Sequence, residues 1–518
     1  MSRKISAADA KARVHAGGEV AFLDVREAGE FGEGHPFLAV PAPYSTLEIA
    51  APGLMPRRDV EIILVDAGDG VAARAACRLE EMGFTDVATI DGGIRGWQDG
   101  GFTLFKGVNV PSKTLGELAE EIFHPKMIGA DTLRQWRAEG RDFAFYDTRP
   151  PAEYSKMRVP GSVCLPNGEL VHRHDAVRAD TSRPILITCA GRTRGIIGAV
   201  GLKLAGIDNV YALENGTQGW ALAGEMLERG NKAEAYPVLT AGEAEASAAR
   251  AENFAARENI RFIDAAGFAG LAGDRDRTLY LFDVRSSEEF AAGHIEGAVH
   301  AVGVQLVQST DQWVGVRNAR IVLTDDTGMR AALAAYWLAR LGYETFALRA
   351  KDAAGTVHAA PVPPLLAPLP PVSPEEAVER QARGAVILDL RSSQAHRAGA
   401  PVGALWAIRP RLDRLAGGVP REALLLADDP RFASLAVPDL LEAGTKDVAL
   451  IEGGFAAWKK AGLPVETPGG PSDAEAIDFL VFVHDRHDGN LESSRRYLAW
   501  EQGLLAQLDP AERAVLLL

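Results

Sequence analysis

Four segments of the 518-residue chain repeat one pattern, and this repetition limits the possible folds more than any other feature. Each segment is a short apolar strand that ends in Asp-x-Arg and runs into a polar helix start: "FLDVREAGEF", "FYDTRPPAEY", "LFDVRSSEEF" and "ILDLRSSQAH". The aspartates are Asp24, Asp147, Asp283 and Asp389, separated by 123, 136 and 106 residues. Such spacings are those of whole domains rather than of solenoid repeats. The sequence therefore predicts four tandem domains of one type, here called the first to fourth repeats.

A second apolar strand follows in each repeat: "IILVDAGDG", "ILITCAGRT", "IVLTDDTGM" and "LLLADDPRF". The residue at its end is Asp66, Cys189, Asp325 or Asp428, and it lies 42 residues after the motif aspartate in three repeats and 39 in the fourth. A tryptophan follows 30 or 31 residues later in "GGIRGW", "NGTQGW" and "GGFAAW", whereas the third repeat reads "ALRAKDAAG" there. The shared intervals indicate that the four residues occupy one structural position.

Helical patterns rich in Ala and Leu, such as "GVAARAACRLEEMGF", separate the strands. Strands that alternate with helices predict α/β domains, each a doubly wound, mostly parallel sheet with helices on both faces. Ligands of such sheets bind outside the carboxyl ends of the strands. Cys189 is predicted to lie at such an end.

The landmarks divide the chain into five segments: 1–106, 107–235, 236–358, 359–468 and 469–518. The first four hold the repeats, and the last is a helical C-terminal tail with no repeat partner. "AGEAEASAARAENFAARE" is expected to form a connecting helix before the third repeat. The Pro-rich "HAAPVPPLLAPLPPVSPEE" is expected to be an extended, semi-rigid linker before the fourth.

Composition excludes several classes of function. The formal net charge of −15 argues against a nucleic-acid partner, which favours a basic face. No apolar run is long enough for a membrane span, and the N-terminus lacks the apolar core of a signal peptide. Three cysteines are too few for a disulfide framework, and the sequence has no C-x-x-C pair of the kind that indicates a zinc site. We therefore expect a cytoplasmic protein with no metal and no cofactor.

The combination of Asp-x-Arg, the strand–Cys–loop–helix unit and the terminal Gly-x-x-x-x-Trp resembles the rhodanese superfamily of sulfurtransferases. "EEFAAGHIEGAVHA" in the third repeat is similar to a family segment, and "AEYSKMRVPGSVCLPNGEL" is a degraded form of it in the second. The resemblance covers roughly residues 5–467 and is weaker in the fourth repeat. It implies a bacterial tetra-rhodanese with one catalytic cysteine.

Cys189 is the predicted nucleophile. A free thiol is only a small fraction thiolate at pH 7, but the unpaired N–H groups and dipole of a helix N-terminus favour negative charge. Gly191 and Gly195 allow the loop to curl its N–H groups inward, and Arg192 and Arg194 add positive charge. We expect these groups to lower the thiol pKa by about two units. The same cradle is expected to hold the terminal sulfur of a persulfide.

The loop from Cys189 to Arg194 has six residues. Phosphatase and arsenate-reductase members of the superfamily have one residue more, so the resemblance disfavours those activities. Sulfurtransferase members of this kind take sulfane sulfur from an anionic donor such as thiosulfate or 3-mercaptopyruvate. They pass it, through a covalent persulfide, to cyanide or a thiol.

Aspartate cannot form a persulfide, and it caps a helix N-terminus well. We therefore expect the first, third and fourth repeats to be inactive, with Asp66, Asp325 and Asp428 in place of the cysteine. An alternative is a non-enzymatic persulfide carrier or scaffold that binds a partner protein through these repeats.

The remaining site predictions concern supporting residues. Asp147 and Arg149 recur in every repeat, which indicates an ion pair between the strand end and a neighbouring loop. Cys77 is expected to be a small buried hydrophobe, and Cys164 either the same or a second thiol near the site. The predicted catalytic residue is Cys189, and the predicted substrate contacts are Arg192, Arg194, Ala190, Gly191, Thr193, Gly195, Arg149, Arg158 and Glu169.

The tail segment "VFVHDRHDGN" is expected to be a solvated loop before the amphipathic helix "LESSRRYLAWEQGLLAQL". A strap over the active pocket or a dimer contact is the alternative. A metal site there would need further ligands. The predicted partners are a small anionic sulfur donor and a thiol acceptor, with no nucleic acid and no membrane; a protein acceptor and a homodimer stay open.

Overall fold

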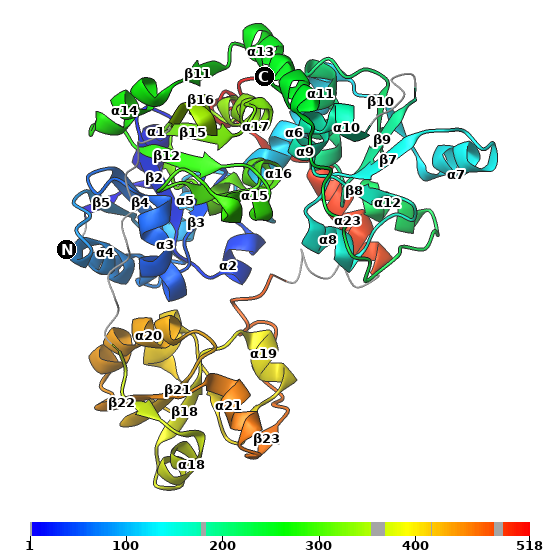
Figure 1. The fold of residues 1–518 in the computed structure, drawn as a ribbon. Coiled ribbons are helices and arrows are strands. Elements are labelled where there is room, and N and C mark those ends of the chain that lie inside the picture. Colours follow the sequence, from blue (N-terminus) through cyan, green and yellow to red (C-terminus); the bar gives the residue numbers. More distant parts are fainter. Residues whose placement is uncertain (1–2, 178–182, 354–367, 416, 481–489) are drawn as a thin grey trace.

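The computed structural model describes residues 3–177, 183–353, 368–415, 417–480 and 490–518, which fold into four α/β units, one for each repeat (Figure 1). In each unit the short N-terminal strand pairs with the last strand of the parallel sheet. The central strand that ends at the Cys189 position, the Asp-x-Arg strand and a short edge strand follow in that order. All pairings within these four orders are parallel. The predicted fourfold α/β architecture is confirmed.

The first repeat runs through the following elements in chain order: β1 (Arg3–Ile5), α1 (Ala7–Val14), β2 (Val20–Asp24), α2 (Ala28–Glu33), β3 (Val40–Pro41), η1 (Tyr44–Thr46), α3 (Leu47–Leu54), β4 (Glu61–Val65), α4 (Val71–Glu81), β5 (Val87–Ile90) and α5 (Gly93–Asp99). The second repeat follows α6 (Val110–Phe123) and comprises β6 (Met127–Ile128), α7 (Ala130–Ala138), β7 (Ala144–Asp147), α8 (Pro151–Lys156), β8 (Val163–Cys164), α9 (Asn167–His172), α10 (His174–Val177), β9 (Ile185–Thr188), α11 (Thr193–Leu204), β10 (Val210–Leu213) and α12 (Gly216–Leu222).

The third repeat follows α13 (Ala241–Glu258) and comprises β11 (Arg261–Ile263), α14 (Ala265–Gly273), β12 (Leu279–Asp283), α15 (Ser287–Ala292), β13 (Val299–His300), α16 (Gly303–Gln308), η2 (Thr310–Gln312), β14 (Val316–Arg317), β15 (Arg320–Asp325), α17 (Met329–Arg340), β16 (Glu344–Arg349) and η3 (Ala350–Ala353). The fourth comprises β17 (Pro371–Val372), α18 (Pro374–Ala382), β18 (Val386–Asp389), α19 (Ser393–Ala398), β19 (Ala400–Pro401), β20 (Leu405–Trp406), η4 (Arg409–Arg414), β21 (Glu422–Leu426), α20 (Pro430–Ala443), β22 (Asp447–Ile451), α21 (Gly454–Lys460) and β23 (Val465–Glu466). The tail holds α23 (Leu491–Gln502), η6 (Leu505–Gln507) and α24 (Pro510–Arg513).

The connecting helix predicted before the third repeat is confirmed as α13, with a capping box at its N-terminus from Thr240 and Glu243. Most of the Pro-rich linker and the segment "VFVHDRHDG" lie outside the described residues.

The Asp-x-Arg motif forms the same clasp in all four repeats, and its aspartate is buried in each. The arginine of each motif pairs with the motif aspartate at 2.5–2.6 Å. Each guanidinium also donates to a backbone carbonyl eight residues further along the chain, at Gly34, Met157, Gly293 and Gly399. The expected ion pair between strand end and neighbouring loop is thus confirmed, and it fixes where the chain leaves the sheet.

The recurring tryptophans also have a common role. Trp97, Trp220 and Trp458 are buried, and each indole N–H donates to the carbonyl six residues later. In the first, second and fourth repeats this bond closes the C-terminal end, because it satisfies the one polar atom of a ring that otherwise packs in the apolar core.

The repeats are joined by specific contacts. Strand β14 of the third repeat pairs antiparallel with β2 of the first, so the sheet of the first repeat includes a strand from the third. Figure 1 shows the fourth repeat docked beside α3 and α4 of the first, while α23 lies against the second repeat. Lys11 in the first repeat binds Glu512 of the tail at 2.8 Å. The tail therefore connects parts of the molecule that are distant in the sequence.

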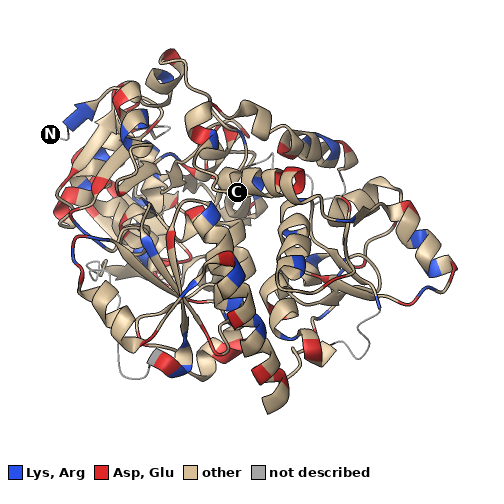
Figure 2. Ribbon diagram, turned by 90° about the horizontal axis from the view of Figure 1, so that it is seen from above, with Lys and Arg blue, Asp and Glu red and all other residues tan. Residues whose placement is uncertain are grey.

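Charged residues of both signs are interspersed along the helices seen in Figure 2. In the described part of the chain, every helix is too short or too polar to serve as a membrane span.

We predict that Arg409→Met undocks the fourth repeat. Arg409 is buried and pairs with Glu48 of the first repeat at 2.6 and 2.7 Å and with Asp439 of its own repeat at 2.8 Å. Loss of this cation leaves the Glu48 carboxylate without its partner and removes the Arg409 contact to Asp439, which keeps bonds from Tyr44 and Arg74. Breaking a buried pair in this way costs about 3–5 kcal/mol. Calorimetry should then show a separate, earlier unfolding transition for the fourth repeat.

Arg414→Met is the matched control, because Arg414 is half-exposed and its pair with Asp69 spans the same two repeats at 3.2 Å. Its expected cost is at most about 1 kcal/mol. Equal effects of the two substitutions would contradict the assignment of Arg409 as the anchor.

Candidate active site

Cys189 directly follows β9, and α11 begins four residues later. Its side chain is 2% exposed, and its Sγ accepts a hydrogen bond from the Gly195 amide at 3.2 Å. Gly216 has a left-handed φ of +54°, and a Cβ there would lie 2.2 Å from the Cys189 carbonyl oxygen. This close approach explains why "NGTQGW" carries glycine at that position.

Burial raises the pKa of the Cys189 thiol above its ordinary value. The Arg194 charge and the amides of Gly191 and Gly195 lower this pKa but do not offset the burial, and the Glu501 carboxylate raises it further. The expected decrease of the pKa was therefore wrong for the site as it stands in the structure. Burial of the thiolate costs more free energy than the loop amides and the Arg194 charge recover.

Both loop arginines are neutralised by acids. The guanidinium of Arg192 donates to Glu117 of α6 at 2.7 and 2.8 Å and also contacts Glu120. Arg194 forms a two-pronged pair with Glu153 of α8 at 2.6 and 2.8 Å. No local pattern in the sequence identifies these partners, since Glu117 lies 75 residues from Arg192. The pocket is consequently less positive than its two arginines alone would make it.

A cavity of about 300 Å³ opens at Cys189, and four parts of the chain line it. The second repeat contributes Arg149, Glu153, Lys156, Met157, Cys189, Ala190, Gly191, Arg192, Thr193 and Arg194. The segment before and within α6 contributes Val108, Asn109 and Lys113, the third repeat Gln305, Gln308 and Ser309, and α23 Tyr497 and Glu501. The site is thus assembled from more than the repeat that holds the cysteine.

Helix α23 packs against α6 and α12 and lines one side of the cavity with Tyr497 and Glu501. Glu501 accepts a hydrogen bond from the Thr193 hydroxyl at 2.7 Å, which joins the tail to the Cys189 loop. The amphipathic helix predicted for the tail is confirmed, and it lies at the cavity of the second repeat, as expected of a strap.

The structure separates Arg149 from Arg158. Arg149 lines the cavity, but its guanidinium is held by Asp147 at 2.6 and 2.8 Å and by the Met157 carbonyl. Arg158 binds Glu228 at 2.6 Å and is not among the described residues that line the cavity. Its prediction as a substrate contact is corrected, because its side chain serves the C-terminal end of the repeat.

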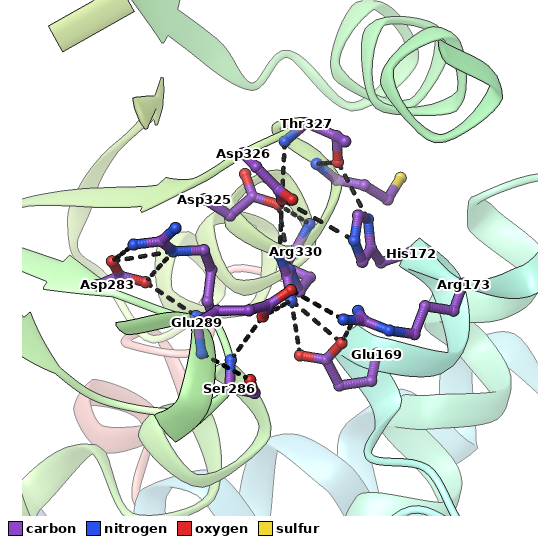
Figure 3. Close-up of polar contacts among 12 residues, drawn as sticks. Glu169, His172, Arg173, Asp283, Ser286, Glu289, Asp325, Asp326, Thr327 and Arg330 are labelled. Atoms are coloured by element: carbon purple, nitrogen blue, oxygen red, sulfur yellow. Dashed lines mark hydrogen bonds and ion pairs between the residues drawn. The ribbon is translucent and has the colours of Figure 1, made fainter. Parts of the chain in front are cut away.

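Glu169 also lies elsewhere, in a buried ion-pair network around Arg330 of the third repeat (Figure 3). It binds Arg330 at 2.9 Å and also contacts Arg173. Glu289 and Asp326 each bind the same Arg330 guanidinium at 2.6 Å. Glu169 does orient an arginine, as expected, but this arginine belongs to the inactive third loop. Its prediction as a substrate contact is corrected.

His172, Glu289 and Asp326 could each direct a ligand atom to one point. Arg330 already bonds both acids, and its guanidinium charge opposes a metal ion there. We interpret the group as part of the Arg330 network.

Asp66 uses the amide cradle of the first repeat for its own carboxylate. It accepts hydrogen bonds from the amides of Gly68 at 2.8 Å, Gly70 at 3.1 Å and Ala72 at 2.9 Å. The last donor lies six residues after the aspartate, as the donor to Cys189 lies six residues after the cysteine. The loop is retained, and a carboxylate takes the place of the sulfur.

The third repeat is similar, since Asp325 accepts from the amides of Gly328 at 2.6 Å and Arg330 at 3.1 Å. In the fourth repeat Asp428 is exposed, and the next residue, Asp429, caps α20. The expected helix-capping role is confirmed for the first and third repeats and moves by one residue in the fourth.

The other cysteines differ from Cys189. Cys164 is buried, its Sγ donates to the Arg149 carbonyl at 3.5 Å, and burial raises its pKa to about 12. It lies beside the Arg149 backbone but is not among the described residues that line the cavity. The expectation that Cys77 is buried was wrong: it is on the exposed face of α4.

Comparison with known proteins agrees with this geometry. A model of the rhodanese-like domain matches residues 6–100, 129–223 and 266–350. The crystal structure of thiosulfate sulfurtransferase from Pseudomonas aeruginosa is 36% identical, covers 99% of each chain and has a TM-score of 0.90. The uncharacterized protein YqhL of Bacillus subtilis (strain 168) is 24% identical over 103 residues, or 20% of this chain and 80% of YqhL.

The crystal structure of the Alr3790 protein from Anabaena sp. is 28% identical, covers 20% of this chain and 82% of that chain, and has a TM-score of 0.19. The family model's three matches fall in the first three repeats, and the fourth has the same strand order. The chain belongs to the rhodanese-like domain family.

Proposed function

We propose that the protein is a sulfurtransferase that carries sulfane sulfur as a persulfide on Cys189. The observation that carries the proposal is a cysteine sulfur that lines a cavity and accepts a hydrogen bond from the Gly195 amide, directly after the six-residue loop Cys189–Arg194. The full-length likeness to a thiosulfate sulfurtransferase supports it. The donor is a small anion, thiosulfate or 3-mercaptopyruvate, and the acceptor is cyanide or a thiol.

In the first step, the Cys189 sulfur attacks the outer sulfur of the donor. A new S–S bond forms to Sγ, and the donor's bond to that sulfur breaks, so sulfite or the pyruvate fragment leaves with the electron pair. In the second step, the acceptor attacks the outer sulfur and Cys189 leaves. The amides of Gly191 and Gly195 are suited to stabilise the charged sulfur in both steps.

The substrate contacts within this proposal are the residues near Cys189 that line the cavity: Ala190, Gly191, Arg192, Thr193, Arg194 and Arg149. Gly195 acts through its amide. Because each arginine is already paired, the donor anion is bound by the whole arrangement rather than by an unpaired cation.

A persulfide carrier or scaffold is the second candidate. The inactive loops offer limited support, because the third is engaged by the second repeat through Arg330 and the first contacts the fourth through Asp69. Steady-state turnover with thiosulfate and cyanide separates the two functions, since a carrier turns over poorly without its partner.

We predict that thiosulfate or 3-mercaptopyruvate adds the mass of one sulfur atom to the intact protein. Cys189→Ser should abolish the gain, because the serine hydroxyl cannot hold sulfane sulfur, while Cys164→Ser should retain it. Intact-mass spectrometry makes the measurement. The absence of a gain with both donors in the unmutated protein would refute the proposal.

We further predict that moving the cysteine to the third loop does not move the activity. Asp325→Cys in a Cys189→Ser background places a thiol five residues before Arg330, but that loop is closed by Glu169 and Glu289. No sulfur gain is expected. Asp325→Cys alone, with Cys189 intact, is the control for folding, and sulfur on the introduced thiol in either protein would contradict the prediction.

A further inference from the structure

Glu501 of α23 is a buried carboxylate with one oxygen that lacks a partner. The residue is 2% exposed, and its Oε1 accepts from the Thr193 hydroxyl at 2.7 Å. Among the described residues, no donor reaches its Oε2. A buried polar atom without a partner costs free energy, so its retention calls for a functional reason.

The free oxygen lies beside the Cys189 loop. A Cβ built on Gly191 would be 3.4 Å from Glu501 Oε2, and the Gly191 amide is one of the donors that stabilise the Cys189 sulfur. Both Glu501 and Cys189 line the same cavity. The Cys189 thiol and a carboxylate oxygen without a partner therefore lie at the same cavity.

The three arginines that line the cavity with Glu501 are already paired. On one side Glu117 and Glu120 of α6 hold Arg192. On the other side Glu153 of α8 holds Arg194, and Asp147 holds Arg149.

Two lysines complete the charged lining. The Lys113 ammonium donates to the Val108 carbonyl at 2.6 Å, and Lys156 is on the exposed face of α8. Histidine is absent from the described lining, so Glu501 is the carboxylate there with an oxygen available to a proton.

The proposed chemistry requires such a group. Burial keeps the Cys189 thiol protonated near neutral pH, yet only the thiolate attacks sulfur well. We propose that Glu501 takes the proton of Cys189 as the thiol attacks the donor, and returns it when the persulfide is discharged. This inference rests on the proposed function and adds the proton-transfer residue to it.

The steps balance with thiosulfate as donor. The S–H bond of Cys189 breaks and its proton passes to the Glu501 carboxylate, while Sγ bonds to the outer sulfur and sulfite leaves with the electrons of the broken S–S bond. The neutral carboxylic acid then no longer repels the anionic persulfide. When cyanide or a thiolate removes the outer sulfur, the Cys189 thiolate takes the proton back from Glu501.

A purely electrostatic role for Glu501 makes the opposite prediction. Its negative charge raises the Cys189 pKa, so Glu501→Gln would increase the thiolate fraction and accelerate sulfur uptake near pH 7. If Glu501 accepts the proton, its replacement by glutamine slows the same step. The sign of one rate change therefore distinguishes the two roles.

The experiment measures the rate of single-turnover persulfide formation with thiosulfate, by quenched intact-mass spectrometry from pH 6 to 10. At pH 7, E501Q is expected to be slower than the unmutated protein by about tenfold or more. Its rate should rise with pH as the thiolate fraction grows, and the two rates should converge above the Cys189 pKa. Glu492→Gln, in the exposed first turn of the same helix, should match the unmutated protein throughout.

E501D, which keeps an acid but withdraws it by one methylene, should give an intermediate rate, and it replaces E501Q if thermal unfolding shows that E501Q does not fold. An E501Q or E501D rate equal to or above that of the unmutated protein at pH 7 overturns the inference and leaves the proposed function intact. Failure of the unmutated protein to form any persulfide refutes the proposed function itself, and the inference with it.

Discussion

In the first three repeats the central strand runs into a helix through a loop whose backbone N–H groups converge on one point. These groups favour negative charge there, and the group that supplies it differs between the repeats. In the first and third repeats, the carboxylates of Asp66 and Asp325 occupy this point and accept hydrogen bonds from the loop amides. In the second repeat the Cys189 sulfur takes the same place. One loop geometry thus serves as a helix cap in two repeats and as the candidate reaction centre in another.

The second loop depends on its neighbours for its electrostatics. Glu117 of α6 and Glu153 of α8 neutralise Arg192 and Arg194, and the C-terminal helix adds a further acid at Glu501. Burial then outweighs the favourable amides in setting the thiol pKa. These contacts give the third repeat and the tail a physical role, because both complete the lining of the cavity.

The sequence predicted those features that depend on local pattern. Strand ends, the Asp-x-Arg pairs and the bounds of α13 follow from periodicity and motif spacing, and the structure has them. Contacts between distant segments left no local signal. Nothing in "LITCAGRTRGIIGA" identifies Glu117 or Glu501 as partners of this loop, and nothing in "PNGEL" directs Glu169 to Arg330. The thiol pKa was mispredicted for the same reason, since it depends on burial by those segments.

One of the four loops is proposed to hold sulfur, in a cavity built by the second repeat, α6, the third repeat and α23. A crystal structure of the full chain after treatment with thiosulfate tests this most directly. We expect one additional sulfur atom bonded to Cys189 Sγ, within hydrogen-bonding distance of the Gly191 and Gly195 amides and facing Glu501. An unmodified Cys189, with the donor bound at the loop of another repeat, would contradict it.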